Sequence, residues 1–272
     1  MQRFFEDPSV AAAYLKYRTG YSPAVADRVM RYLAEEKAGP YDFALDVGCG
    51  SGQFTRLLAA NFTAVTGLDV SPAQIQAARS VQNPKNITFR VGQAEILPVD
   101  DASVDLITSA TASHYYDWPV FEKEVDRVLK PKGCLAVLVY DLVYLDHPDA
   151  KVKKQLTDCI ETYMDYANDQ ELKASTPEAY KHHLNDYDSI RSSLYSDQIR
   201  DDMEVREEIS VHKFVECYKT FGCNVRFLER NPETSRFKDF ENSIMGILRS
   251  EEPERTMITM VTPIMMRLAR KP

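Results

Sequence analysis

Residues 46–52 read Asp-Val-Gly-Cys-Gly-Ser-Gly, and this stretch indicates the fold more clearly than any other. It ends the apolar segment 43–47 and precedes residues 53–60, which have a helical pattern. Glycines allow the chain to turn sharply and let a ligand approach the main chain. Amides at a helix N-terminus then bind polar groups of that ligand. The stretch therefore predicts a buried strand, a ligand-binding loop and a helix, in that order.

The spacing of the glycines and two nearby acids separates two classes of ligand. The loop reads G-x-G-x-G, whereas a loop that presents a pyrophosphate reads G-x-G-x-x-G. Asp46 would repel a pyrophosphate but suits the cationic amino group of a methionine moiety. Asp69 ends the next apolar segment, where a carboxylate accepts hydrogen bonds from ribose hydroxyls. These features favour S-adenosylmethionine (SAM) over a nicotinamide dinucleotide.

Strands and helices alternate on both sides of the loop. Helices are predicted at residues 8–19, 22–37, 71–80 and 119–129, and further strands at 65–70, 87–91, 104–109 and 134–140. A turn is expected at residues 130–133. This alternation predicts a parallel sheet covered by helices on both faces. After residue 141 the pattern changes: residues 145–200 are polar and are predicted as helices of a cap. A strand at 203–210, a helix at 211–221 and a last strand at 256–268 follow.

Several segments resemble the class I SAM-dependent methyltransferases. They are the glycine loop, residues 92–105, residues 128–135, and the motif Tyr14-x-x-Tyr17-Arg18, which is similar to the trans-aconitate and UbiE-type small-molecule enzymes. The resemblance extends over residues 11–140. It implies a Rossmann-like α/β fold with strand order 3-2-1-4-5 and two terminal strands, the last antiparallel. The chain would form one domain, 1–272. Helices 1–40 would lie over the cofactor, 41–141 would bind SAM, 145–200 would form a helical lid, and 201–272 would supply the final strands and helix.

The resemblance also implies which residues bind the cofactor. They are Tyr14, Arg18, Asp46, Gly48, Gly50, Gly52, Asp69, Val70, Gln93, Ala94 and Ser109. Arg18 would pair with the carboxylate of SAM, since its fork is bidentate. Gln93 departs from the Asp that the family usually places at the adenine amino group, although an amide oxygen also accepts a hydrogen bond. Three- and four-residue spacing places Tyr14, Tyr17, Arg18 and Tyr21 on one helix face. The alternative is a tyrosine stripe that packs on the sheet.

Residues 108–118 follow the fourth predicted strand and are expected to form the wall of the acceptor site. Ligands of open α/β sheets bind outside the carboxyl ends of the strands, so His114 and Tyr115 are the candidate catalytic residues. Methyl transfer needs alignment and exclusion of water more than acid–base chemistry. His114 is therefore expected to position the acceptor or to take its proton. The alternative is a packed histidine among core aromatic residues.

Composition narrows the range of partners. The net charge of −8 and the absence of a basic run disfavour nucleic acid and a membrane surface. The five cysteines are widely spaced, which predicts neither disulfides nor a metal site and suits a cytoplasmic protein. The sequence does not determine the oligomeric state. If the acceptor is a carboxylate, the cap must supply a cation, and Lys173, Lys181 and Arg191 are the candidates.

The favoured function is O-methylation of a small molecule, at a carboxylate or a hydroxyl. The alternatives are an inactive SAM-binding module, an N- or C-methyltransferase, a methyltransferase of proteins or nucleic acids, and an NAD-type oxidoreductase. The last would need the longer glycine spacing and a second mononucleotide-binding half. A protein or nucleic acid acceptor would need an open cleft where a lid is predicted.

Replacing His114 by Gln tests the two roles predicted for it. If the acceptor must lose a proton to His114, turnover should fall by about 10²–10⁴-fold. The wild-type rate should also fall as pH drops through the reference histidine pKa of about 6.5. If the acceptor is an ionised carboxylate, the rate should be flat from about pH 6 to 8. Turnover near the wild-type value in this variant would exclude the base role.

Overall fold

The computed structural model describes residues 8–18, 20–140, 142–165, 169–175 and 192–272. Their central element is an eight-stranded sheet in the order β3-β2-β1-β4-β5-β8-β6, with β7 also paired to β8. The parallel strands are β1 (Tyr41–Val47), β2 (Phe62–Asp69), β3 (Ile87–Val91), β4 (Val104–Ala110) and β5 (Leu129–Tyr140). The predicted order 3-2-1-4-5 is confirmed.

Two long strands extend the sheet. β8 (Met257–Arg270) is antiparallel to β5, and β7 (Gln198–Ser210) is antiparallel to β8. β7 therefore runs in the direction of the parallel strands, and the prediction that the last strand is the antiparallel one is confirmed. A short strand that was not predicted, β6 (Tyr144–Asp146), pairs with the first part of β8.

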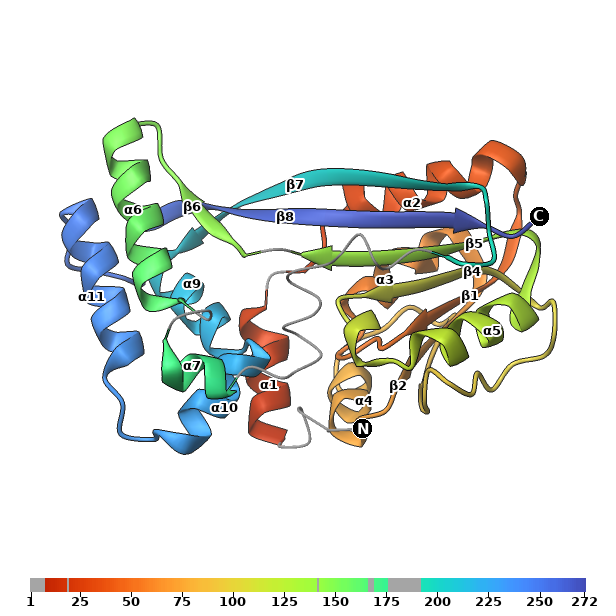
Figure 1. Ribbon diagram of the computed structural model, residues 1–272, viewed down its shortest axis with the longest axis horizontal. Coiled ribbons are helices and arrows are strands. Elements are labelled where there is room, and N and C mark those ends of the chain that lie inside the picture. The colour runs from red at the N-terminus through yellow and green to blue at the C-terminus, as the bar shows by residue number, and fades with distance from the viewer. Residues whose placement is uncertain (1–7, 19, 141, 166–168, 176–191) are drawn as a thin grey trace.

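Helices cover both faces of the parallel sheet. They are α2 (Pro23–Glu36), α3 (Gln53–Leu58), α4 (Pro72–Arg79) and α5 (Trp118–Val128), with a 3-10 turn at Ala59–Asn61. α1 (Pro8–Tyr17) packs on α4 and lies beyond the carboxyl ends of the strands (Figure 1). Neighbouring residues of β1 point to opposite faces: Ala44 packs in the cluster that contains α2 and α3, and Leu45 in the cluster that contains α5. Because both faces are buried at the centre of the sheet, residues 134–139 of β5 form a continuous apolar run.

Capping residues begin three of these helices where the sequence indicates. The side chains of Ser22, Ser71 and Asp117 accept hydrogen bonds from backbone amides in the first turns of α2, α4 and α5. A proline occupies one of the first two helical positions in each case, where its missing amide costs nothing. The helix predicted to start at Ser71-Pro72 is thus found with the expected cap.

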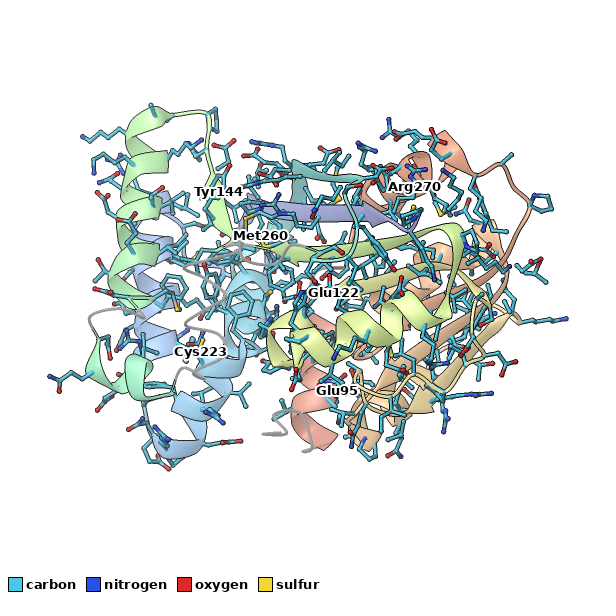
Figure 2. All side chains as sticks on the ribbon, turned by 45° about the vertical axis from the view of Figure 1, so that its right-hand side comes forward. Glu95, Glu122, Tyr144, Cys223, Met260 and Arg270 are labelled. Carbon is cyan, nitrogen blue, oxygen red and sulfur yellow. The ribbon has the colours of Figure 1, made fainter. Side chains whose placement is uncertain are left out.

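A second group of helices lies beyond the parallel sheet. It contains α6 (Ala150–Tyr163), α7 (Gln170–Ser175), α9 (Val211–Lys219), α10 (Gly222–Arg230) and α11 (Arg236–Leu248). We call this group the helical lobe; Figure 1 shows it around the ends of β6, β7 and β8. In Figure 2, Arg270 marks the sheet end of β8 and Met260 the lobe end. No helix in the described ranges is long and apolar enough to cross a membrane.

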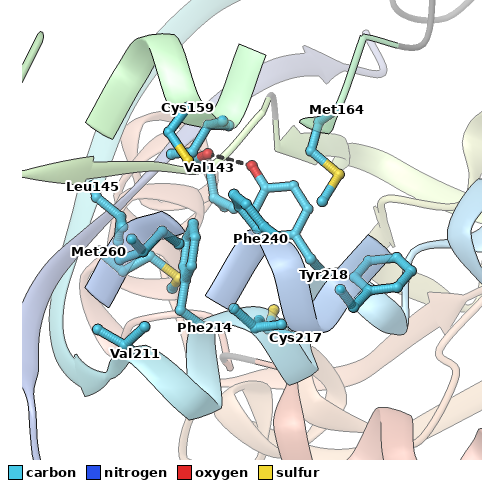
Figure 3. Close-up of a cluster of buried hydrophobic side chains, with 14 of the residues drawn as sticks. Val143, Leu145, Cys159, Met164, Val211, Phe214, Cys217, Tyr218, Phe240 and Met260 are labelled. Atoms are coloured by element: carbon cyan, nitrogen blue, oxygen red, sulfur yellow. Dashed lines mark hydrogen bonds between the residues drawn. The ribbon is translucent and has the colours of Figure 1, made fainter. Parts of the chain in front are cut away.

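The helical lobe has a hydrophobic core of its own. Phe214, Tyr218, Phe240 and Met260 meet in it, and the hydroxyl of Tyr218 donates a hydrogen bond of 2.7 Å to the carbonyl oxygen of Val143 (Figure 3). The sequence predicted α9 but not α10 or α11. Their apolar residues pack on other helices of the lobe, and α10 lacks a side-chain cap, so its start carried no local signal.

The described parts of residues 145–200 belong to this lobe and to the sheet. α6 packs on α11, and α7 packs on α10. Near residue 195 the chain returns to α5, where the hydroxyl of Tyr195 donates to Asp126 at 3.1 Å. Lys181, Arg191 and the side chain of Lys173 lie outside what the structure describes. The lid and the other divisions of the domain therefore stay predictions.

The turn predicted at residues 130–133 lies inside β5 in the structure. Residues 130–133 were expected to separate α5 from a strand beginning at 134, but β5 already begins at Leu129, which pairs with Val104. The pairing shifts register between Val104 and Leu106, and Lys132 has a positive φ of 64°. Residues 130–133 therefore form an irregular turn within β5, and only the predicted start of the strand at residue 134 was wrong.

Replacing Tyr218 by Phe tests the core of the helical lobe. The change leaves the buried carbonyl of Val143 without its hydroxyl donor, which should lower the free energy of unfolding by about 1–3 kcal/mol. Tyr144→Phe is the matched control: its hydroxyl bonds Glu204 at an exposed position, so the effect should stay within about 0.5 kcal/mol. Urea unfolding of both variants measures the difference, and equal effects would contradict the buried hydrogen bond.

Candidate functional site

A pocket lies at the carboxyl ends of β1, β2 and β4, beneath α1. Its cavity volume is about 120 Å³. The glycine loop forms its floor, Asp69 and Val70 one side, and residues 110–112 the other, while Tyr14 of α1 covers it. The place agrees with the rule that ligands of open α/β sheets bind beyond the carboxyl ends of the strands. Eight of the predicted site residues line it: Tyr14, Asp46, Gly48, Gly50, Asp69, Val70, Ala94 and Tyr115.

The glycines of the loop differ in what a Cβ at each position would contact. A Cβ on Gly48, whose φ is 67°, would stand 2.3 Å from Cβ of Ala112. A Cβ on Gly52, whose φ is 80°, would meet the ring of Phe89 at 2.5 Å. Gly52 is therefore required by packing and does not line the pocket. Gly50 also has a positive φ, but a Cβ there would have only Gln74 nearby, at 3.8 Å, so its main chain faces open space.

Asp46 is a fully buried carboxylate at the end of β1. The hydroxyl of Thr55, on α3, donates to it at 2.6 Å, and the hydroxyl of Thr108, on β4, donates at 2.7 Å. Burial raises the pKa of Asp46 to about 6, and the two hydroxyl donors limit the rise. A buried carboxylate that lines a pocket favours a cationic ligand group, which would offset the loss of hydration.

Asp69 holds the glycine loop against the end of β2. The backbone amides of Gly50 and Ser71 each donate to one of its carboxylate oxygens at 2.8 Å. The first bond fixes the loop and the second fixes the start of α4. The carboxylate is thus oriented at the pocket wall, at the place where the sequence predicted contact with a ribose.

Five predicted residues do not line the pocket: Arg18, Gly52, Gln93, Ser109 and His114. Ser109 acts through Tyr116, because its hydroxyl lies 3.0 Å from that of Tyr116, which in turn donates to the carbonyl of Val47 at 2.9 Å. The main chain on both sides of Gln93 does reach the pocket, at Gly92 and Ala94. The roles assigned to these residues stay predictions.

Arg18 points from the end of α1 toward the helical lobe. Its Nε donates to the hydroxyl of Thr220 at 2.9 Å, and one Nη donates to the Thr220 carbonyl at 3.3 Å. The guanidinium also lies 4.8 Å from the ring centre of Tyr14 and 4.2 Å from that of Phe221. Through these contacts α1 bridges the cofactor pocket and the residues that follow α9.

Tyr21 lines the pocket, but the prediction assigned it to the wrong element. It was predicted on the helix face of Tyr14, but α1 ends at Tyr17, and Tyr21 lies in the connection to α2. Its hydroxyl nevertheless reaches Thr111 at 2.7 Å, and both residues line the pocket. Thr111 and Tyr116 belonged to the predicted wall 108–118, yet no local pattern distinguishes the members of that segment that face the ligand.

Four tyrosines line the pocket: Tyr14, Tyr21, Tyr115 and Tyr116. Tyr115 lines it directly, and the ring of His114 stacks behind at 4.0 Å between ring centres. Burial raises the pKa of Tyr14, Tyr21 and Tyr115 above the ordinary tyrosine value. These hydroxyls are therefore protonated at neutral pH and act as hydrogen-bond donors, not as bases.

The strand order, the glycine loop before α3 and the acid that ends β2 together define the Rossmann-like fold of the class I SAM-dependent methyltransferases. Comparison with known proteins agrees, since residues 45–137 match the family described as a methyltransferase domain. Residues 45–137 are accordingly the methyltransferase domain of a SAM-dependent enzyme with the class I fold, and its cofactor is SAM.

Three relatives illustrate the similarity. A Dictyostelium discoideum protein named as a methyltransferase is 25% identical over 97% of this chain and 94% of its own length. The 2-methyl-6-phytyl-1,4-hydroquinone methyltransferase of Synechocystis is 35% identical over 49% of this chain and 42% of its own. A solved structure from Anaeromyxobacter dehalogenans, described as a type II methyltransferase, has a TM-score of 0.72 and 24% identity, and covers 93% of this chain and 98% of its own.

Replacing Asp46 by Asn should stabilise the ligand-free protein. The folded pKa of about 6 lies above the ordinary 3.8, so the stability that protonated Asp46 contributes is present below pH 3.8 and is lost as pH rises through about 6. Asn has no charge to bury. At pH 7.5 the free energy of unfolding of the variant should therefore be about 1–3 kcal/mol higher than that of wild type. The difference should shrink toward pH 4. Urea unfolding across this range measures it, and a pH-independent difference would contradict the buried charge.

Proposed function

We propose that this methyltransferase transfers the methyl group of SAM to an oxygen of a small-molecule acceptor, as a carboxylate or an acidic hydroxyl. The observation that carries the proposal is the set of titratable groups in the pocket. Among the described lining residues, the tyrosines and Cys49 have pKa values raised by burial. The two lining carboxylates already accept hydrogen bonds from the protein, Asp46 from Thr55 and Thr108, and Asp69 from two backbone amides. None of these groups is suited to deprotonate an amine or a carbon acid. An acceptor that is already an oxyanion needs no such base.

For the cofactor we propose the following placement. The methionine amino group lies toward Asp46, the ribose hydroxyls bind the carboxylate of Asp69, and the adenine lies against Val70 and Ala94. Gly48 and Gly50 allow the main chain to approach the cofactor. The sulfonium then faces Thr111 and Tyr115, where water is excluded by aromatic rings. All of these residues line the pocket, which supports the placement.

The relatives and the cysteines support further parts of the proposal. The Synechocystis relative is named for a hydroquinone, a small molecule that carries hydroxyl groups, which agrees with a small acceptor of the UbiE-type subgroup. We also infer a cytoplasmic location, supported by five cysteines that are all buried thiols. A screen of SAM consumption against a metabolite panel, with the mass of each product, tests the reaction class. Products methylated only at nitrogen or carbon would overturn the proposal.

Replacing Asp69 by Ala should weaken SAM binding strongly. The ribose would lose two charge-assisted hydrogen bonds of about 1.5–3 kcal/mol each, so the dissociation constant should rise by about 100-fold or more. Calorimetry with SAM measures it, with Asp158→Ala as the control, because Asp158 is an exposed acid paired with Lys154 on α6. Wild type should bind SAM but not NAD. An unchanged SAM affinity in Asp69→Ala would contradict the ribose assignment.

A further inference from the structure

A second cavity lies beside the cofactor pocket, on the other side of Tyr21. Its wall includes Arg18 from the end of α1, Tyr140 from β5, Phe221 after α9 and Ile264 from β8. Tyr21 lines both cavities and is the element that separates them. The second cavity has a volume of about 20 Å³. Because one water needs roughly 10–15 Å³ by this measure, the space suits a group of carboxylate size and is too small for a ring.

Arg18 brings a positive charge into this cavity. Among the residues that the structure describes, its hydrogen-bond partner is the uncharged Thr220, and no carboxylate lies within ion-pair distance of it. The other charged group of the wall, Glu207, is paired with Lys213 at 3.0 Å. The rings of Tyr14, Tyr140 and Phe221 surround the guanidinium and reduce its contact with water. Counting only the residues that the structure describes, the uncompensated charge of the cavity wall is therefore positive, and an anion would stabilise it.

We propose that Arg18 binds a carboxylate of the acceptor, while the oxygen that receives the methyl group lies past Tyr21, beside Thr111 in the cofactor pocket. The proposal rests on the function proposed above and narrows its substrate class. The acceptor is a small molecule with a carboxylate a short distance from the methylated oxygen. A guanidinium suits this role because its planar fork matches a carboxylate. The cation that would bind the acceptor carboxylate is thus Arg18, whereas it was expected from the sequence among residues 173–191.

The chemistry of the transfer is unchanged by this contact. A lone pair of the acceptor oxygen forms the new C–O bond as the C–S bond of SAM breaks. The electron pair of that bond goes to sulfur, which leaves S-adenosylhomocysteine. The carboxylate on Arg18 takes no part in bond formation and serves to align the reacting oxygen. Arg18 is accordingly a specificity-determining residue, and its effect should fall on acceptor binding.

The experiment uses propionate and propionamide as probes of the second cavity. The protein is saturated with S-adenosylhomocysteine, and binding is followed by ligand-observed NMR titration. Wild type should bind propionate at least about tenfold more tightly than propionamide, since only the former pairs with Arg18. In Arg18→Met, propionate affinity should fall about 10- to 100-fold, the usual range for a lost charge-assisted contact. The affinity for S-adenosylhomocysteine should stay within about twofold of wild type, because Arg18 does not line the cofactor pocket.

Two further variants distinguish charge from packing. Thr220→Val removes the hydroxyl that Arg18 contacts but keeps the guanidinium, so propionate binding should persist. Arg18→Gln keeps a hydrogen-bonding amide without the charge. It repeats the test if the melting temperature of Arg18→Met is too low for the titration. Equal binding of propionate by Arg18→Gln and wild type, or no binding by wild type, would overturn the proposal.

The same measurements separate this proposal from the two others that concern the site. If Arg18→Met loses affinity for S-adenosylhomocysteine, Arg18 holds the cofactor carboxylate, as the family resemblance implies, and the acceptor role is overturned. If wild type binds neither SAM nor S-adenosylhomocysteine, the cofactor placement fails, irrespective of Arg18. Retained cofactor binding with selective loss of propionate is the result that supports the acceptor role.

Discussion

The site depends on a buried carboxylate that joins three elements of the fold. Asp46 ends β1 and receives hydroxyl hydrogen bonds from Thr55 of α3 and Thr108 of β4, so the strand before the glycine loop, the helix after it and the neighbouring strand share one anchor. The raised pKa of Asp46 shows that burying this charge costs stability in the ligand-free protein. A cationic ligand group would offset that cost, which links the fold of the loop to the ligand it accepts.

A second constraint is the long antiparallel pair β7 and β8, which carries the chain from the parallel sheet into the helical lobe. β8 contributes Met266 and Leu268 to the core beneath α2, and Met260 to the core of the lobe. The two cores therefore share a strand, and their relative position follows from the sheet. α1 lies where they meet and packs on both α4 and α9, and Arg18, just after its end, donates a hydrogen bond to Thr220. A cofactor pocket and a second cavity then adjoin each other, with Tyr21 between them.

The accuracy of the sequence-based predictions followed how local each signal was. Apolar strands, capping residues and the glycine loop are decided within a few residues, so β1 to β5 and the helices around them were predicted nearly as found. α10 and α11 carry no such local mark, because their apolar faces match partners distant in the sequence. Tyr21 was assigned to the wrong element, although it does line the pocket. α1 ends at Tyr17, before the predicted end at residue 19, and Tyr21 lies in the connection to α2.

The sequence alone determined the class of fold and the cofactor, because glycine spacing and the two acids Asp46 and Asp69 act through the backbone next to them. The order of the first five strands was expected from the family resemblance and not from any pattern in the residues. Only the tertiary structure decided which side chains meet across the pocket and where Arg18 points. Its guanidinium lies against Thr220, 202 residues later in the chain. A contact at that separation in the chain depends on how the two cores are joined by their shared strand. No periodicity or spacing in the sequence predicts it.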